Sequence, residues 1–129
     1  MEELTQEEIK AMNDNLKEAL LMDNDDSVEI IEKGDYWEKL LCFSSQVRGI
    51  YYFTKKNIIF IGGLAGTTNF SIYYKKIKDI KKCNVGLFIP CGVLITVYDE
   101  NKNKDVKYKL SLLKRDKWIK FIEDRMKNN

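Results

Sequence analysis

Histidine is absent from this sequence of 129 residues. Histidine is the side chain that most often acts as a general base near neutral pH and activates a serine or cysteine nucleophile. Carboxylate pairs remain, such as Asp99 with Glu100 and Glu123 with Asp124, but they occur in strongly polar segments where solvated charge is the ordinary explanation. We therefore expect no catalytic residues and a protein that is not an enzyme.

Cysteine and proline are scarce, and the only proline is Pro90. Cys42, Cys83 and Cys91 lack the Cys-x-x-Cys spacing of zinc sites and the density of a disulfide framework. The acidic run 23–26 lacks the glycine and final glutamate of an EF-hand loop. We therefore expect no metal and no cofactor, with the cysteines as small apolar packing residues in a reducing cytoplasm.

Long apolar runs are also missing. No run approaches the roughly 18 residues of a membrane span, and the acidic, amphipathic first 22 residues do not resemble a secretory signal. A content of 44% hydrophobic and 33% charged residues is typical of a folded globular domain, and the chain has room for one large core. The expected location is cytoplasmic, with a peripheral position at the inner membrane face as the alternative.

Charge is distributed unevenly along the chain. The formal net charge is +2, but residues 1–32 carry a net charge of −9 and residues 33–129 a net charge of +11. These segments attract each other at low ionic strength. One hypothesis is that the acidic arm folds back and masks a basic face. The other is an acidic helix kept for solubility or for contacts between copies, and both stay open.

The N-terminal segment has the pattern of a helix. Thr5 and Glu8 form a capping box, and apolar side chains then recur near one helical face at Ile9, Met12, Leu16, Ala19 and Leu20. This pattern predicts a helix from Gln6 to Met22. The polar run 23–27 predicts a linker, so we expect an acidic helix and linker at 1–27 and a domain at 28–129.

Short runs of β-branched and aromatic residues follow, divided by turn signals. The clearest hairpin joins 46–54 to 57–62, and the strict alternation of 106–112 predicts an antiparallel partner for 93–97. A short strand or helical turn after Val28 is expected to lead into a first strand near 37–43. The other predicted strands lie near 46–54, 57–62, 70–75, 77–83, 85–89 ending at Pro90, 93–97 and 106–112.

Apolar residues near the C-terminus recur at i, i+3, i+4 and i+8, at Trp118, Phe121, Ile122 and Met126. This stripe predicts a helix that buries one side. A sheet that nearly closes into a barrel leaves an open end, which a helix carrying Trp and Phe is well sized to cover. The fold class expected from the residues is a mainly β barrel with a C-terminal capping helix, plugged by Trp118.

Two segments carry a family resemblance. Arg48-Gly-Ile-Tyr-Tyr-Phe-Thr-Lys-Lys-Asn-Ile-Ile-Phe resembles a hairpin of GRAM domains and bacterial PH-like domains, and Ile72-Tyr-Tyr-Lys-Lys-Ile-Lys-Asp-Ile is similar to the element that follows it. The resemblance covers 28–126 and implies a PH-like barrel of about seven antiparallel strands in two near-orthogonal sheets, plus an extra N-terminal helix. Some members bind phosphoinositides or other anionic lipids and many bind proteins or peptides, so the fold alone does not name the ligand.

Five lysines within residues 75–82 form the most basic stretch. Such a stretch either contacts anionic lipid head groups or a nucleic-acid backbone, or it protects a strand edge from pairing with another chain. The phosphoinositide signature is incomplete, because Ile50 stands where a second base is expected beside Lys39 and Arg48. The candidate ligand-binding residues are Arg48, Lys55, Lys56, Lys75, Lys76, Lys78, Lys81 and Lys82.

These observations favour a non-catalytic binding module for a protein or peptide, acting in interaction or scaffolding. The expected surface is a groove between a sheet edge and the terminal helix, or the loops at Lys55 and 62–68. The glycines of 62–68 lack the Lys-Ser/Thr ending of a phosphate-binding P-loop. The alternative is a peripheral membrane module that binds anionic lipid through its basic face. A pI of 8.3 and the acidic arm argue against nucleic acid, and the oligomeric state stays open.

Overall fold

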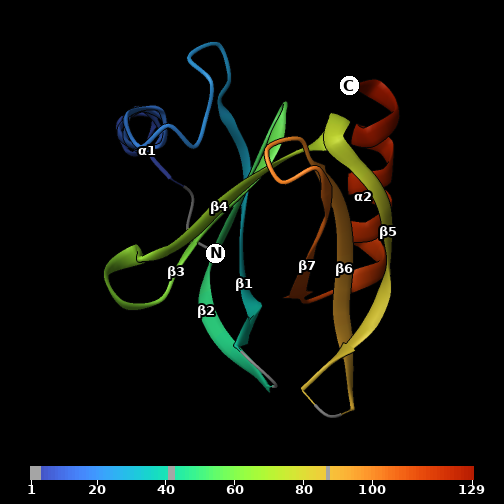
Figure 1. Cartoon of the computed structure of the whole chain (residues 1–129). Coiled ribbons are helices and arrows are strands. Elements are labelled where there is room, and N and C mark those ends of the chain that lie inside the picture. The colour runs from blue at the N-terminus through green and yellow to red at the C-terminus, as the bar shows by residue number, and fades with distance from the viewer. Residues whose placement is uncertain (1–3, 41–42, 87) are drawn as a thin grey trace.

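The computed structural model describes residues 4–40, 43–86 and 88–129. Two helices and seven strands make up the fold (Figure 1). Their bounds are α1 Gln6–Glu18, β1 Val28–Leu40, β2 Phe43–Thr54, β3 Asn57–Gly62, β4 Thr68–Tyr73, β5 Ile77–Val85, β6 Ile89–Asp99, β7 Lys104–Leu112 and α2 Arg115–Asn128. Short 3-10 turns at Leu64–Gly66 and Tyr74–Lys76 follow β3 and β4.

All seven strands pair in antiparallel fashion in the order β4-β3-β2-β1-β7-β6-β5. The mainly β fold of seven antiparallel strands with a C-terminal helix is therefore confirmed. The strands form one continuous sheet, where two near-orthogonal sheets were expected, because β1 joins both halves. It pairs with β2 along its whole length but with β7 only where Gly34–Tyr36 face Leu112–Leu110.

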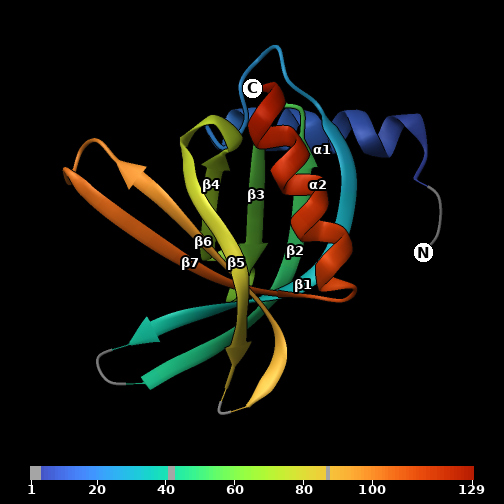
Figure 2. The same cartoon turned by 90° about the vertical axis from the view of Figure 1, so that its right-hand side faces the viewer.

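Glycine allows the close contact at the centre of this crossing. A Cβ atom on Gly34 would lie 2.7 Å from the carbonyl oxygen of Ser111 and 2.8 Å from the ring of Tyr51. Beyond this point the β1–β2 and β6–β7 hairpins diverge from each other, as Figure 2 shows. The sheet thus keeps an opening between its two halves.

The main core lies between the inner face of the sheet and α2. Trp118 is 2% exposed and stacks on Phe53, with ring centroids 4.5 Å apart and an interplanar angle of 7°. Ile122, one turn later, is fully buried. The predicted helix stripe is therefore confirmed, and Trp118 fills the mouth of the barrel as expected.

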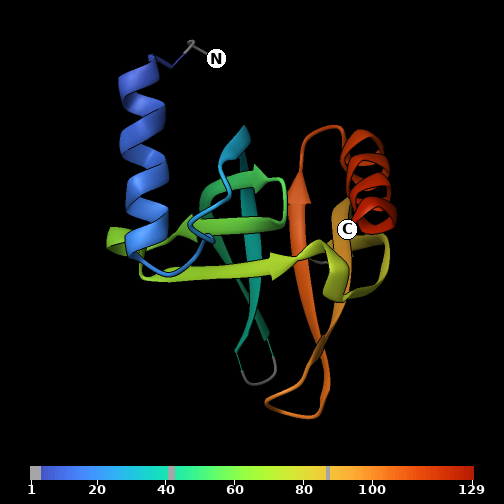
Figure 3. The ribbon, with the colours of Figure 1, turned by 90° about the horizontal axis from the view of Figure 1, so that it is seen from above.

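A second, smaller core lies on the opposite side of β3. Leu16 of α1 and Met22 pack with Ile59 against the outer surface of β2 and β3. Figure 3 shows α1 beside this half of the sheet and distant from α2. β3 consequently has buried side chains on both of its faces, among them Ile58 and Ile59.

Several predicted boundaries were wrong. The first helix ends at Glu18 rather than Met22, because Leu20 has a φ of 62° and stops the helical run. No separate strand occupies 85–89 in the described residues, since Val85 ends β5 and Ile89 begins β6. Pro90 therefore lies inside β6 instead of ending a strand.

The first strand begins at Val28, well before the expected 37–43. Residues 41 and 42 of that prediction, and with them Cys42, lie outside the described residues. The strand expected at 70–75 ends at Tyr73, because Tyr74–Lys76 form a 3-10 turn. Neither helix within the described ranges has the length and apolar character that a membrane crossing requires.

Candidate functional site

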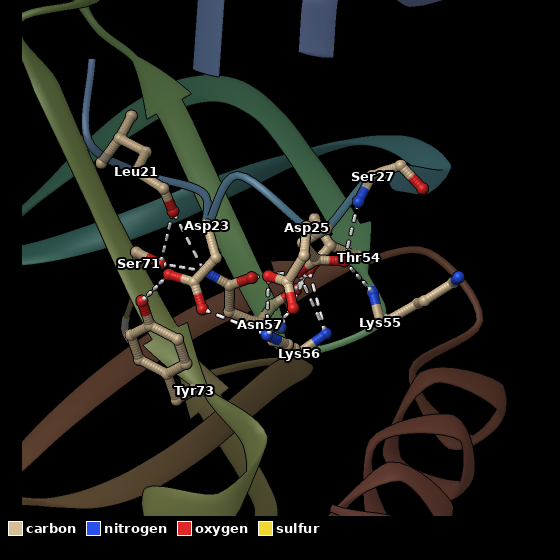
Figure 4. A network of polar contacts seen from close by, with 11 residues as sticks. Leu21, Asp23, Asp25, Ser27, Thr54, Lys55, Lys56, Asn57, Ser71 and Tyr73 are labelled. Carbon is tan, nitrogen blue, oxygen red and sulfur yellow. Dashed lines mark hydrogen bonds and ion pairs between the residues drawn. The ribbon is translucent and has the colours of Figure 1, made fainter. Parts of the chain in front are cut away.

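The β2–β3 turn carries two candidate residues, Lys55 and Lys56, and the structure places the acidic segment 23–26 directly on it (Figure 4). Asp26 is 3% exposed. Its carboxylate accepts hydrogen bonds from the Thr54 hydroxyl at 2.6 Å and from the backbone N–H groups of Lys55 and Lys56 at 3.0 and 3.3 Å. The carboxylate thus satisfies the donors of the turn and fastens the N-terminal segment to it.

Ion pairs reinforce this attachment. The Lys56 ammonium lies 2.8 Å from Asp25 and 3.5 Å from Asp23. The hydrogen bond that Lys56 donates and the charge of Lys56 lower the pKa of Asp25, and the same hydrogen bond to the Asp25 carboxylate raises the pKa of Lys56. Tyr73 also donates to Asp23 at 2.9 Å. Lys56 therefore already has carboxylate partners within the chain.

The lysines of residues 75–82 do not form one free patch. Lys78 pairs with Asp105 at 3.0 Å and Lys82 with Asp116 at 2.8 Å, and Lys76 lies 3.9 Å from Glu100. Within the described residues, Lys75 and Lys81 have no carboxylate within 4 Å.

Three of these lysines, Lys78, Lys81 and Lys82, lie on β5, which is an edge of the sheet. This placement agrees with the hypothesis that lysines protect an edge strand. Arg48 is exposed on β2, opposite Asp35 in the register of β1 and β2. The candidate residues are therefore spread over the β2–β3 turn, β2, the 3-10 turn Tyr74–Lys76 and β5.

A hollow of about 340 Å³ occupies the opening where β1 and β7 separate, and none of its residues was among the candidates. We call this site the fork, and it is lined by Tyr36, Trp37, Lys39, Leu94, Lys107 and Lys109. It thus joins aromatic, aliphatic and basic side chains from three strands, β1, β6 and β7.

The lysines of the fork differ from those of β5 in their charge environment. Within the described residues, no carboxylate lies within 4 Å of the ammonium groups of Lys39, Lys107 or Lys109. Lys39 and Lys107 are exposed, whereas Lys109 is half-buried. Three positive charges therefore surround the hollow without internal neutralisation, and they attract an anionic group.

Trp37 and Leu94 supply the apolar part of the site, and both are half-buried. The indole N–H of Trp37 donates to the Ser111 hydroxyl at 3.2 Å, which holds the ring over β7. Leu94 faces Lys109 in the register of β6 and β7. Burial raises the pKa of Tyr36, so its phenol stays protonated at neutral pH.

Backbone edges line the fork on both sides. Past Tyr36, the described residues of β1 pair only with β2, and β7 from Lys104 to Lys109 pairs only with β6. Each of these segments consequently has one edge of N–H and C=O groups without a strand beside it.

The sequence pattern does not reveal the fork, because Lys107 and Lys109 alternate with apolar residues, as on any solvent-facing strand. Only tertiary structure places them opposite Trp37.

The described residues contain no cluster of three acidic or cysteine side chains able to hold a metal ion. Cys83 is half-buried, and burial raises the pKa of its thiol.

Comparison with known proteins identifies the fold. No family model and no curated protein matches the sequence. The structure is similar to the C-terminal domain of an unknown protein from Leishmania infantum, with a TM-score of 0.64 and 19% identity over 91% of this chain and 95% of that one. It is also similar to the Vps36 N-terminal PH domain, with a TM-score of 0.56 and 15% identity over 84% of each chain.

At these identities the likeness shows the fold alone, and that fold is PH-like. The predicted PH-like architecture is thus confirmed. The narrower resemblance to GRAM domains stays a prediction.

Proposed function

We propose that this chain is a non-catalytic PH-like module that binds a protein or peptide partner at the fork. One observation carries the proposal: a hollow of about 340 Å³ combines Trp37 and Leu94 with three lysines that have no carboxylate partner in the described structure. Sites that bind peptides typically join an apolar anchor point to polar groups that set orientation.

Other surfaces support a peptide partner less well. Lys55 and Lys56 contact the chain's own segment 23–26, and three of the lysines in 75–82 have acidic neighbours. A ligand at either place must displace these internal contacts, whereas a ligand at the fork displaces none of them. The absence of histidine supports a binding role over catalysis.

Random-peptide display on the full chain tests this function. We expect recovered peptides to bind the free protein in calorimetry and to lose at least about tenfold in affinity in the double variant Lys107→Glu, Lys109→Glu. A double variant with the same change of charge on α2, Lys120→Glu and Lys127→Glu, is the matched control and should bind normally. Failure to recover any peptide that binds in solution would contradict the proposal.

An anionic membrane surface is the second candidate, favoured by exposed apolar side chains at the β5–β6 turn. Phe88 is 84% exposed and Ile89 is 55% exposed. A Cβ atom on Gly86, in the same turn, would lie 3.8 Å from the Trp37 ring, so the turn is next to the fork. Apolar side chains beside lysines are typical of proteins that adsorb to anionic lipid.

Sedimentation with vesicles of phosphatidylcholine, with and without phosphatidylserine, tests the second candidate. Membrane binding predicts that the chain sediments only with the anionic vesicles, less so at high salt, and that Phe88→Ser reduces the bound fraction. Equal recovery with both vesicle types, or no effect of Phe88→Ser, would exclude this mode.

A further inference from the structure

The two strand segments that border the fork diverge and leave their backbone edges unpaired. On one side are Trp37–Lys39 of β1, which pair with β2 alone, and on the other are residues 104–109 of β7, which pair with β6 alone. Figure 2 shows the two hairpins separating beyond their crossing. An extended chain that enters this space meets main-chain donors and acceptors that no described strand uses.

The lysines are spaced to match such a chain. Lys107 and Lys109 are two residues apart on one strand, so their side chains lie on one face, about 6.8 Å apart along β7. Side chains at positions i and i+2 of an added strand have the same spacing. Acidic residues at alternate positions of a ligand therefore face these two lysines, and Lys39 approaches from the other side of the hollow.

The apolar side chains of the fork indicate that the ligand also has an apolar side chain. The indole of Trp37 and the side chain of Leu94 line the same hollow as the lysines. A volume of about 340 Å³ is at the lower end of the range for ligand pockets. It accommodates one large apolar side chain together with the adjoining backbone.

We propose that the fork binds an acidic peptide segment in extended conformation, added as a strand beside β7. Carboxylates at positions i and i+2 of the segment pair with Lys107 and Lys109, and an apolar side chain on the same face, at position i−2 or i+4, packs on Trp37 and Leu94. This inference rests on the proposed function and names the chemistry of the partner. A lipid head group uses the lysines but not the strand edges, so the geometry favours the peptide.

Two labelled peptides of identical composition test the inference on the full chain. One alternates its residues so that the acidic and aromatic side chains share one face of a strand, Phe-Thr-Glu-Thr-Glu-Thr-Phe, and the other groups them, Phe-Phe-Glu-Glu-Thr-Thr-Thr. Fluorescence anisotropy should show at least about tenfold tighter binding of the alternating peptide, because only its carboxylates match the period of the strand. Equal affinities would overturn the inference, since charge alone would then explain binding.

Variants locate the bound peptide. Lys107→Glu with Lys109→Glu should weaken the alternating peptide at least about tenfold, and Lys120→Glu with Lys127→Glu should not. Trp37→Ala should weaken binding of the alternating peptide as well. If Trp37→Ala does not fold, the comparison of the two lysine pairs still tests the site. Equal weakening by both lysine pairs would indicate non-specific attraction and contradict the site.

N-methylation of alternate residues in the peptide removes backbone donors while preserving charge. A strand added at the fork should lose at least about tenfold in affinity on one of the two methylation patterns. No loss on either pattern would rule out strand addition. If displayed peptides depend on Lys107 and Lys109 but carry neither acidic residues nor alternation, the inference fails while the proposed function stands.

Discussion

Asp26 is the residue that connects the acidic N-terminal segment to the barrel. Its buried carboxylate accepts hydrogen bonds from the backbone N–H of Ser27 at 2.8 Å, from the Thr54 hydroxyl and from two N–H groups of the β2–β3 turn. A buried carboxylate is costly unless it is hydrogen-bonded, and here the donors come from both partners of the contact. One side chain therefore couples the stability of the segment to that of the hairpin.

Replacing Asp26 with Ala should destabilise the protein by about 2 to 4 kcal/mol, because one buried and three half-buried donors lose their acceptor together. Urea unfolding followed by circular dichroism measures the change. Asp25→Ala is the matched control, since Asp25 is exposed and contacts only the Lys56 ammonium at the surface. A free energy of unfolding that changes equally in both variants would contradict the role of Asp26.

The pair of Asp25 and Lys56 predicts a weak dependence of stability on pH. Lys56 lowers the pKa of Asp25 below its ordinary value of 3.8, so the folded state favours the charged carboxylate. The stabilisation is fully present above pH 3.8 and disappears as the pH falls through the lower pKa of the folded state. Unfolding of the wild type and of Asp25→Asn, compared at pH 6 and at successively lower pH, should therefore converge in acid.

Side chains of the candidate sites show the limit of single-sequence analysis. The cluster at 75–82 is conspicuous in the sequence, but the acidic residues that pair with it come from distant positions such as Asp105 and Asp116. Lys107 and Lys109 look like ordinary solvent-facing positions until β1 brings Trp37 beside them. Pairing between residues about 70 apart is decided by tertiary structure, which local patterns do not encode.

At the scale of elements, α2 closes the barrel through a small number of large contacts. Trp118→Ala should cost about 3 to 5 kcal/mol, because it removes a buried aromatic that stacks on Phe53 and leaves a cavity. Thermal or urea unfolding measures the loss. Lys120→Ala, at an exposed position of the same helix, should change the stability little. A similar loss of stability in both variants would contradict a specific role of Trp118.

Elements with a strong period were predicted well and those with a special backbone were not. The β2–β3 hairpin and α2 follow directly from alternation and from the i, i+3, i+4 stripe. The end of α1 depends on the positive φ of Leu20, a residue that seldom adopts it. Pro90 is compatible with the start of a strand as well as with its end, and here it lies one residue inside β6.

At the scale of the whole molecule, α1 makes the second core and gives the sheet a covered outer surface. Leu16 is 2% exposed in this core, whereas Leu20 is 90% exposed. Leu16→Ala should cost about 2 to 5 kcal/mol, and Leu20→Ala should cost little, because only the first removes buried apolar surface. Differential scanning calorimetry checks the pair, and equal effects would show that α1 does not contribute a core.

Charge is also organised over the whole molecule. In the described residues, the acidic segment 1–32 forms ion pairs with the rest of the chain at Lys56 and Arg125. The lysines of the fork have no such partners. The masking hypothesis therefore concerns the β2–β3 turn, whereas the described structure leaves the positive charge of the fork without a carboxylate partner.

The placement of β3 between two cores determines how the protein opens. We expect hydrogen exchange at the peptide groups of Ile58 and Ile59 to require that both α1 and the interior of the barrel separate from β3, because one core packs on each face of this strand. Partial opening of either layer leaves the other in place. The rate of hydrogen–deuterium exchange at these amides should therefore be among the slowest in the protein and should report the unfolding of the entire chain.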